Sequence, residues 1–354
     1  MKPVRLAQVG VGNWGRNLLR AFASQPGVEV AWACDVRAEA LAAAARHHPH
    51  LHTTARVEDV LDDEAVEAVV IATETPQHAP CAEAALRAGK HVFVEKPLAH
   101  AVEDAERLVA LAEASGKTLM VGHLLRYHPA FEHVERLIRD GALGEVHYLY
   151  SQRVNLGVVR RHENAFDSLA PHDLALALAL IGRPAVAVAA QGHAYLQPGV
   201  EDVVFATVFF DGGALAHLHT SWLDPHKVRK VTVVGSRQMA VVDDMEPAEK
   251  VRLYDKGAVL LQEDAFTGFA GAVAVRSGDV VIPHVPTTEP LRLEAEAFLT
   301  SVREGTPPRT GGREGLAVVR ILDAARRSLA AQGARIELGK TGDGGLKTEG
   351  GPKP

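Results

Sequence analysis

Short apolar runs alternate with Ala- and Leu-rich stretches through the first 120 residues of this chain. The runs lack the regular apolar/polar alternation of half-exposed strands, so each predicts a strand buried on both faces, as in a parallel sheet covered by helices. Right-handed crossovers would then produce a doubly wound α/β domain over residues 1–122. We expect strands at Val4–Val9, Val28–Cys34, Val66–Ala72, His91–Val94 and Thr118–Val121, and helices at Trp14–Ser24, Arg37–Arg46, Val57–Leu61, Ala79–Ala88 and Ala101–Ala114.

The pattern changes after Gly122, where later strands largely alternate apolar and polar residues. This alternation predicts a second α/β domain, residues 123–338, with a large open, mainly antiparallel sheet. Because such a face commonly serves as an oligomer interface or a substrate wall, we expect a homodimer or homotetramer. Residues 339–354 have almost no apolar content and are expected to be disordered. The expected strands are Val146–Val154, Val203–Phe210, Ala214–Thr220, Lys230–Val234, Met239–Asp243 and Val251–Tyr254, and the helices are Pro129–Arg139, one after Pro171, Glu289–Glu304 and Arg313–Ala331.

Composition excludes several classes of protein. The net charge of −6 argues against a general affinity for nucleic acid, and no apolar run is long enough for a membrane span. Two cysteines cannot build a disulfide framework, and the N-terminus leaves no room for a signal peptide, so we expect a cytoplasmic enzyme. The histidines of residues 47–52 lack a Cys or acidic partner at ligand spacing, so no metal is expected.

A glycine motif of the form G-x-G-x-x-G separates the first expected strand from the first expected helix. Gly10 permits a tight turn, Gly12 lets the backbone approach a pyrophosphate, and Gly15 lets helix and strand pack closely. The helix N-terminus offers free N–H groups to the phosphates. We therefore expect Asn13 and Trp14, within the same loop, to lie against a dinucleotide.

Asp35 stands 20 residues beyond Gly15, at the end of the second expected strand. A carboxylate there accepts hydrogen bonds from both ribose hydroxyls and repels a 2′-phosphate, which favours NAD over NADP. Arg37 is the opposing signal, because an arginine at this position can pair with that phosphate. Two further loops follow strands and should also face the cofactor. Their expected contacts are Thr73, Thr75, Pro76, His78, Glu95 and Lys96.

The glycine motif, the ATETPQH segment and the EKPL segment together resemble the glucose–fructose oxidoreductase/inositol dehydrogenase/MocA (Gfo/Idh/MocA) family of pyranose dehydrogenases. The resemblance extends over residues 4–338. It implies a Rossmann domain, an open antiparallel α/β domain and NAD-dependent oxidation of a sugar secondary hydroxyl to a ketone.

The resemblance also implies roles for individual residues. Lys96 matches the lysine that positions the substrate hydroxyl and the nicotinamide ribose and takes part in proton transfer. His172 matches the acid/base histidine of a D-x-x-x-H pattern, but the aspartate position holds Ser168, with Asp167 one residue early. Asp173, beside His172, is a candidate for orienting the imidazole or capping the helix.

The segments 122–129 and 151–166 resemble one subgroup, the UDP-N-acetylglucosaminuronate 3-dehydrogenases of bacterial surface-polysaccharide synthesis. An anionic nucleotide sugar suits an arginine-rich loop, because arginine binds carboxylate or phosphate through two parallel hydrogen bonds. Each arginine alone can equally be a solvated surface charge. The expected substrate contacts are Arg126, Tyr127, Arg153, Asn155, Arg160, Asn164, Ser168 and His172.

Two other functions fit the same sequence. One is a dehydrogenase of myo-inositol or a free sugar, which an arginine-poor pocket would favour. The other is a non-catalytic NAD(H) sensor or scaffold, which would require that Ser168 had disabled His172. If NAD stays bound through turnover, a keto acid such as 2-oxoglutarate can act as the regenerating oxidant.

Overall fold

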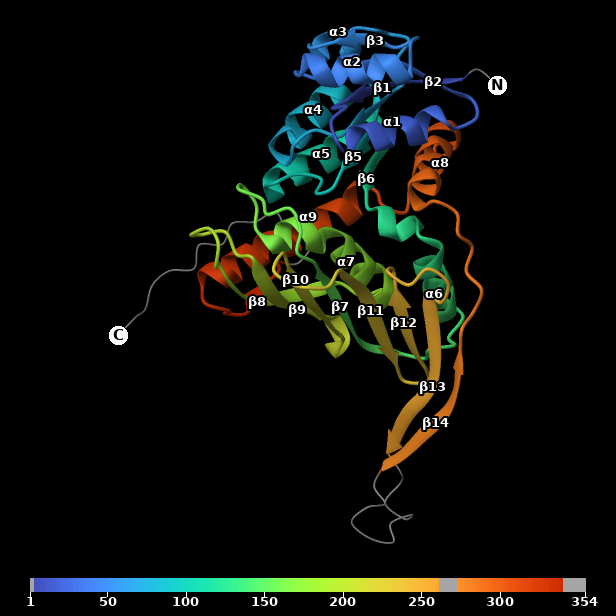
Figure 1. Ribbon diagram of the computed structural model, residues 1–354, viewed down its shortest axis with the longest axis vertical. Coiled ribbons are helices and arrows are strands. Elements are labelled where there is room, and N and C mark those ends of the chain that lie inside the picture. The colour runs from blue at the N-terminus through green and yellow to red at the C-terminus, as the bar shows by residue number, and fades with distance from the viewer. Residues whose placement is uncertain (1–2, 261–272, 340–354) are drawn as a thin grey trace.

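The computed structural model describes residues 3–260 and 273–339, which form two α/β domains (Figure 1). The first domain has a six-stranded parallel sheet in the order β3-β2-β1-β4-β5-β6, with helices on both faces. The order reverses between β1 and β4, where such sheets bind their ligands. Its elements are β1 (Val4–Val9), α1 (Gly15–Ala23), β2 (Val28–Cys34), α2 (Ala38–His47), β3 (His52–Thr54), α3 (Val57–Leu61), β4 (Ala68–Ile71), α4 (Thr75–Arg87), β5 (His91–Glu95), α5 (Val102–Ser115) and β6 (Leu119–Gly122).

The second domain has a nine-stranded sheet in the order β14-β13-β12-β11-β7-β10-β9-β8-β15. All neighbouring strands are antiparallel except β7 and β10, which run parallel. The expected fold class is thereby confirmed. The strands are β7 (Val146–Val154), β8 (Ala185–His193), β9 (Val203–Phe210), β10 (Leu215–Ser221), β11 (Val228–Gly235), β12 (Met239–Asp243), β13 (Val251–Leu260), β14 (Val273–Val281) and β15 (Ile336–Glu337). The helices are η1 (Leu124–Tyr127), α6 (Pro129–Arg139), α7 (Ala165–Ile181), η2 (Asp211–Gly213), α8 (Pro290–Glu304) and α9 (Gly312–Ala330).

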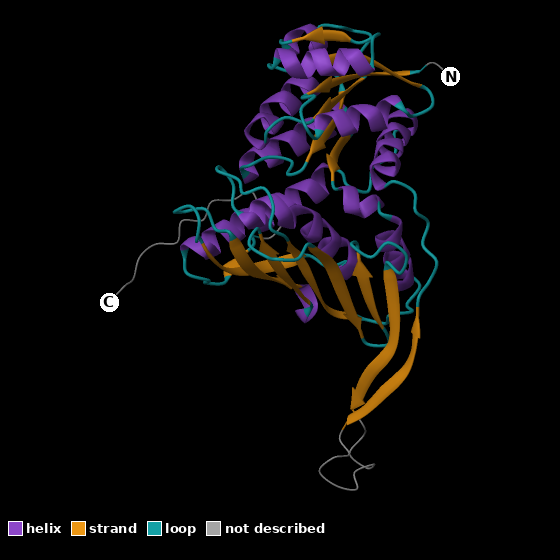
Figure 2. Ribbon diagram, in the orientation of Figure 1, coloured by secondary structure: helices purple, strands orange, loops and turns teal. Residues whose placement is uncertain are grey.

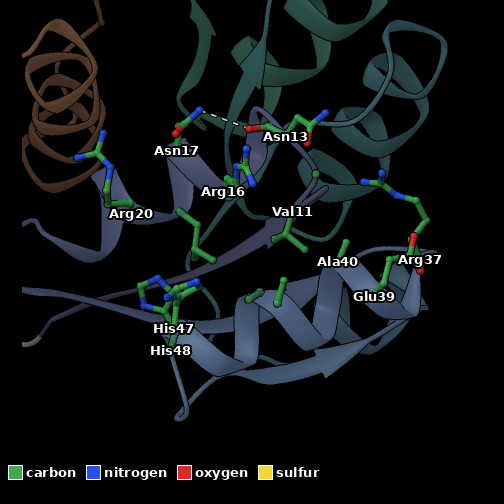
Figure 3. Close-up of a pocket in the computed structure, with 14 residues that line it drawn as sticks. Val11, Asn13, Arg16, Asn17, Arg20, Arg37, Glu39, Ala40, His47 and His48 are labelled. Carbon is green, nitrogen blue, oxygen red and sulfur yellow. Dashed lines mark hydrogen bonds between the residues drawn. The ribbon is translucent and has the colours of Figure 1, made fainter.

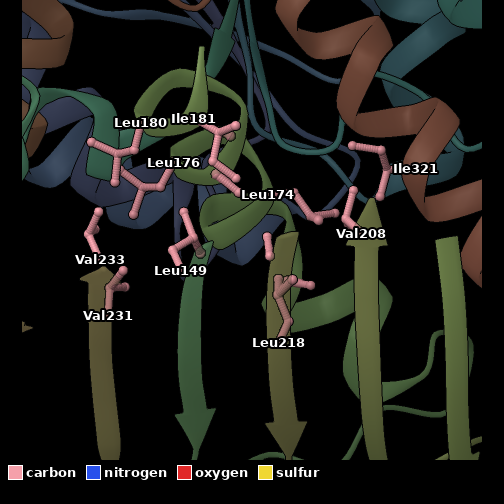
Figure 4. Packing of buried hydrophobic residues seen from close by; sticks show 14 of the residues in the cluster. Leu149, Leu174, Leu176, Leu180, Ile181, Val208, Leu218, Val231, Val233 and Ile321 are labelled. Atoms are coloured by element: carbon pink, nitrogen blue, oxygen red, sulfur yellow. The ribbon is translucent and has the colours of Figure 1, made fainter. Parts of the chain in front are cut away.

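Helix α7 covers one face of the large sheet (Figures 2 and 4). Leu174 and Leu180 of α7 pack with Leu149 of β7 and Leu218 of β10, and all four side chains are buried. Tyr150, one residue beyond Leu149, is exposed on the other face. The sheet is therefore half-covered, as the alternating pattern predicts.

Four strands, β3, β8, β14 and β15, have no counterpart among the expected strands, and three helices differ from the sequence-based expectation. Helix α7 begins at Ala165, not after Pro171, because the Asn164 side chain caps it by accepting the backbone N–H of Asp167. Helix α4 begins at Thr75 rather than Ala79. Helix α8, expected in the second domain, packs against α1 and η1 and contributes to a core of the first domain. Most of the tail expected to be disordered, residues 340–354, lies outside the described residues.

Within the described ranges, the chain contains no helix long and apolar enough to cross a membrane.

Candidate active site

The loop between β1 and α1 requires glycine at two positions. Gly10 has a φ of +88°, and a Cβ there would lie 2.5 Å from the carbonyl oxygen of Ala72. A Cβ on Gly15 would collide with the Gly10 carbonyl oxygen. The Gln8 amide donates to the carbonyls of Gly10 and Gly15, at 2.9 and 2.6 Å, and fixes the turn. The result is a compact cradle that a Cβ would fill, which suits a dinucleotide pyrophosphate at the start of α1.

Asp35, at the end of β2, is a buried acceptor beside this cradle. One carboxylate oxygen accepts the Val11 N–H at 3.0 Å, and the other accepts the N–H and Nε–H of Arg37 at 3.0 and 3.2 Å. Burial raises the pKa of Asp35, but these hydrogen bonds outweigh it and hold the pKa below its usual value. The Arg37 guanidinium also lies over Gly12, so a cation adjoins the expected pyrophosphate position.

Trp14 connects the glycine loop to the end of β5. Its indole N–H donates to the buried carboxylate of Glu95, which also accepts the Lys96 backbone N–H at 3.1 Å. Burial raises the pKa of Glu95. Glu95 and Trp14 therefore hold two loops of the cofactor edge together, and the Trp14 ring remains 44% exposed for a ligand.

His78, expected among the cofactor contacts, has both ring nitrogens beside backbone carbonyls. It is buried, and its ring nitrogens lie 2.7 Å from the Pro97 carbonyl and 3.1 Å from the Thr73 carbonyl, so it joins two loops. The Thr73 hydroxyl, by contrast, is buried without a partner, which fits a polar ligand group. Thr75 and Pro76 form the first turn of α4, where Pro76 is exposed.

Lys96 and His172 come together where the two domains meet. The Lys96 ammonium donates to the Ser168 carbonyl of α7 at 3.0 Å. Burial lowers the pKa of Lys96 in spite of the neighbouring Glu95 carboxylate. Burial and the positive charges of Lys96 and Arg153 hold the pKa of His172 well below 6.5. Both side chains are partly exposed, and at neutral pH His172 is a neutral imidazole able to accept a proton.

Neither candidate carboxylate orients His172. Asp173 forms a buried two-point ion pair with Arg153, with distances of 2.5 and 3.0 Å. Asp167 pairs with Arg326 of α9 at 3.1 Å. Arg153, expected to contact the substrate, is thus paired with Asp173, and Asp173 holds the arginine rather than the imidazole.

Two other expected substrate residues are engaged inside the fold. Arg126 forms a two-point ion pair with Glu135, at 2.8 and 3.3 Å. The Tyr127 ring lies in a hydrophobic cluster, and its hydroxyl lies 3.2 Å from the Thr310 hydroxyl. Both residues brace the connection between β6 and α6 and do not present free polar groups to the site.

The loop from β7 to α7 carries the remaining expected residues. Asn164 caps α7 and donates to Glu201 at 3.0 Å, so both ends of its amide are used. Arg160 is exposed and pairs with Glu163 at 3.2 Å. Asn155 is half-buried. Of this group, Arg160 and Asn155 remain available to a ligand.

His123 was not among the expected site residues, yet it adjoins His172. It follows β6 directly, is buried, and its ring centroid lies 6.5 Å from that of His172 in an edge-to-face arrangement. Burial, with the positive charges of Lys96 and Arg126, lowers the pKa of His123 to about 3. Its place at a strand end, like that of Lys96, is a sequence signal that could have identified it.

A groove of about 550 Å³ lies between α1 and α2 (Figure 3). The exposed Asn13, together with Gly12 and Arg37, lines its edge, so it opens onto the dinucleotide loop. Lys96 and His172 do not line it. No group of three or more His, Cys, Asp or Glu side chains in the described ranges is placed to hold a metal ion.

Two families of known domains match this chain. Residues 4–123 match the oxidoreductase family with an NAD-binding Rossmann fold, and residues 131–241 match the GFO/IDH/MocA C-terminal domain. The chain belongs to the Gfo/Idh/MocA oxidoreductase family. It is therefore an oxidoreductase with an NAD-binding domain, and the glycine cradle, Asp35 and the Thr73 hydroxyl are a donor and acceptor set that fits NAD.

Relatives of this chain are named as dehydrogenases of different substrates. The UDP-N-acetylglucosamine 3-dehydrogenase of Acidithiobacillus ferrooxidans is 28% identical over 91% of this chain and 95% of its own. Its solved structure superposes with a TM-score of 0.78 at 26% identity, covering 94% of this chain and 99% of that one. The inositol 2-dehydrogenase of Rhizobium meliloti is 27% identical over 92% of this chain and 97% of its own. GenD2 from gentamicin A biosynthesis, solved with NAD, shares the fold with a TM-score of 0.79 at 24% identity over 96% of this chain and 97% of that one.

Proposed function

We propose that this protein oxidises a secondary hydroxyl of a sugar nucleotide to a ketone, at C3 of UDP-N-acetylglucosaminuronate, in the synthesis of surface-polysaccharide sugars. The observation that carries the proposal is the meeting of Lys96 and His172 beside the dinucleotide cradle. An alcohol dehydrogenase needs a base for the hydroxyl proton and a cation for the developing alkoxide, and these residues supply both.

The roles follow from protonation states. The neutral His172 accepts the hydroxyl proton, because its low pKa leaves the ring uncharged at pH 7. Lys96 lies beside the expected position of the substrate hydroxyl and stabilises the alkoxide by charge and hydrogen bonding. NAD, when bound against the glycine cradle, supplies the hydride acceptor. The hydrogen bonds that Glu95 accepts from Trp14 and from the Lys96 backbone fix the position of Lys96 relative to the glycine cradle.

The substrate assignment rests on the loop from β7 to α7 and on the relatives. Arg160 and Arg161 are exposed on this loop, and the charges of Arg160 and Glu163 act on Lys96, so the loop lies near the reacting position. Exposed arginines suit a diphosphate or a uronate carboxylate. The relative named as a UDP-N-acetylglucosamine 3-dehydrogenase supports the same substrate class.

One observation favours a second substrate class, myo-inositol or a free sugar. Arg126 and Arg153, two of the expected anion-binding residues, are already paired with Glu135 and Asp173. A pocket with fewer free cations suits an uncharged polyol, and an inositol 2-dehydrogenase is among the relatives.

The test is NAD⁺ reduction at 340 nm with UDP-N-acetylglucosaminuronate, UDP-N-acetylglucosamine, myo-inositol and glucose. The uronate is also supplied with 2-oxoglutarate, which would reoxidise a retained NADH and leave little net absorbance, so turnover in that arm is measured as formation of 2-hydroxyglutarate. Of the four substrates, we expect only UDP-N-acetylglucosaminuronate to be oxidised. Turnover with inositol or glucose instead would overturn the substrate but keep the chemistry.

Two variants extend this assay to the assigned roles. Lys96→Met and His172→Ala should each lower turnover at least ~100-fold, the lower part of the range for a positioned acid–base group. NADH affinity, followed by fluorescence, should change little, because the glycine cradle and Asp35 are untouched. Near-wild-type turnover of either variant would remove that residue from the mechanism, and a wild-type protein that bound NADH but turned over none of the four substrates would favour the sensor function.

We further propose that the enzyme is cytoplasmic and works as a homo-oligomer. Cys34 and Cys81 are free thiols, which suits a reducing compartment. The uncovered face of the large sheet is the proposed subunit contact.

A further inference from the structure

The proposed base, His172, has a buried ring nitrogen that nothing in the described chain satisfies. Its Nδ1 is inaccessible and has no hydrogen-bond partner. A catalytic imidazole needs an acceptor at this nitrogen, because the acceptor fixes which nitrogen carries the proton. The two acidic side chains closest in sequence, Asp167 and Asp173, are paired with Arg326 and Arg153.

The residue beside His172 has the same deficiency. His123 is only 1% exposed, and neither of its ring nitrogens has a hydrogen-bond partner among the described residues. The ring centroids of the two histidines are 6.5 Å apart with an interplanar angle of 83°. Hydrogen bonds to one water molecule, each about 2.8 Å long, would span rings at this separation. Nδ1 of His172 and one ring nitrogen of His123 would give such a water two partners, the fewest that a buried water usually has.

We propose that His123 is a positioning residue that orients His172 through one bridging water. The Nδ1–H of His172 donates to the water, and the water donates to a ring nitrogen of His123. The lone pair of His172 Nε2 is thereby directed toward the substrate hydroxyl. This inference rests on the proposed function of His172 as the base.

The charges around the two rings are consistent with this arrangement. His172 lies in the field of Lys96 from the loop after β5, Arg153 from β7 and Arg229 from β11, and His123 in that of Lys96 and Arg126. These cations disfavour an imidazolium on either ring. His123 therefore stays neutral and keeps a lone pair that can accept from the water.

A substitution at Ser168, also in α7, should compensate for the loss of His123. Ser168 lies four residues before His172, so the two side chains are neighbours on one helix face. An aspartate at 168 would offer His172 a carboxylate acceptor. Ser168→Asp should therefore replace the function of His123, while removal of His123 alone should leave Nδ1 without any acceptor.

The experiment compares His123→Phe, His123→Asn and the double variant His123→Phe/Ser168→Asp. Phenylalanine keeps the aromatic packing and removes the nitrogens, so kcat should fall about 10- to 100-fold with little change in NADH affinity. Asparagine keeps a polar group and should retain kcat within about threefold. The double variant should recover at least about threefold over His123→Phe.

The matched control is His52→Phe, at an exposed histidine that also contacts an aromatic ring, that of Trp32 at 5.1 Å. This control should keep wild-type kcat. A His123→Phe enzyme with wild-type kcat would overturn the proposal, and so would equal losses in His123→Asn and His123→Phe, which would indicate packing alone.

Ring ¹⁵N chemical shifts in the NADH complex provide a readout independent of turnover. Wild-type His172 should be neutral with its proton on Nδ1, and His123→Phe should shift the proton toward Nε2. The resonance is assigned with His172→Gln. An unchanged tautomer would overturn the proposal. If wild type oxidised no sugar but this tautomer shift occurred, the positioning contact would stand and the proposed function would fail.

Discussion

At the scale of single residues, the contacts of Asp35 and Arg37 bear on cofactor choice. The Asp35 carboxylate holds Arg37 by hydrogen bonds of 3.0 and 3.2 Å and lies at the expected ribose position. Asp35→Ser removes the charge that repels a 2′-phosphate and frees the guanidinium to bind it. The ratio of NADP to NAD affinity should rise at least tenfold, about 1.4 kcal/mol, in a fluorescence titration with NADPH and NADH.

Asp35→Ser/Arg37→Ala is the control for this prediction. It lacks both the carboxylate and the guanidinium, so its ratio of NADP to NAD affinity should fall below that of Asp35→Ser. If the single variant bound NADPH no better than wild type, Arg37 would not be a phosphate partner.

Residue contacts are also where sequence reasoning was least complete. The spacing of Gly10–Gly15 and Asp35 predicts the cradle, because the glycines share one turn and the parallel pairing of β1 with β2 brings Asp35 beside it. The partners of Arg126 and Arg153 could not be predicted, since each ion pair joins side chains nine or more positions apart on different elements. The strand-end position of His123 is a sequence signal, but its contact with His172, 49 positions along the chain, could not be predicted because only tertiary packing brings the two rings together.

At the scale of elements, most strands were predictable and some helix starts were not. The strands β1, β2 and β7 have the bounds that their apolar patterns predict, because burial dictates both composition and length. Helix α7 begins six residues before Pro171, since capping by Asn164 outweighs the lost proline N–H. Pro171 cannot donate to the Asp167 carbonyl, and the next carbonyl, that of Ser168, accepts from Lys96. The irregular turn thus contributes to the site.

Helix α8 carries a buried carboxyl that makes stability depend on pH. Glu294 is fully buried, and neither of its carboxyl oxygens has a partner in the described part of the chain. Burial, reinforced by the Glu95 charge, raises its pKa well above 4.5. As pH rises past 4.5, the unfolded chain releases this proton and the folded chain keeps it, so the free energy of unfolding falls. Glu294→Gln removes this pH-dependent loss of stability, because glutamine does not titrate. The variant should have a Tm about 2 °C or more higher at pH 8, with little change near pH 4.5.

The exposed Glu296, two residues further along α8, provides the control. Glu296→Gln should leave Tm unchanged at both pH values, as measured by circular dichroism. A lower Tm of Glu294→Gln at pH 8 would show instead that the folded protein requires the ionised carboxylate.

At the scale of the whole molecule, the uncovered face of the nine-stranded sheet is the largest feature that the proposed chemistry leaves unused. Tyr148 and Tyr150 of β7 stack on each other, and register places them beside Leu215 and His217 of β10, with Phe205 on the next strand. The Tyr148, Tyr150, Leu215 and Phe205 side chains are each 38–45% exposed. An apolar face across three central strands of a single chain is typical of a subunit interface.

We therefore expect two copies to pack these faces together about a twofold axis. In such an interface Tyr150→Asp introduces two carboxylates at once, and each would be buried without a partner. Sedimentation velocity should show an oligomer for wild type and a monomer for Tyr150→Asp at the same concentration. The control, Leu196→Asp, changes an exposed leucine in the loop between β8 and β9 and should stay oligomeric. A Tyr150→Asp protein that remained oligomeric would place the subunit contact elsewhere, and a monomeric wild type would leave this face free for another partner.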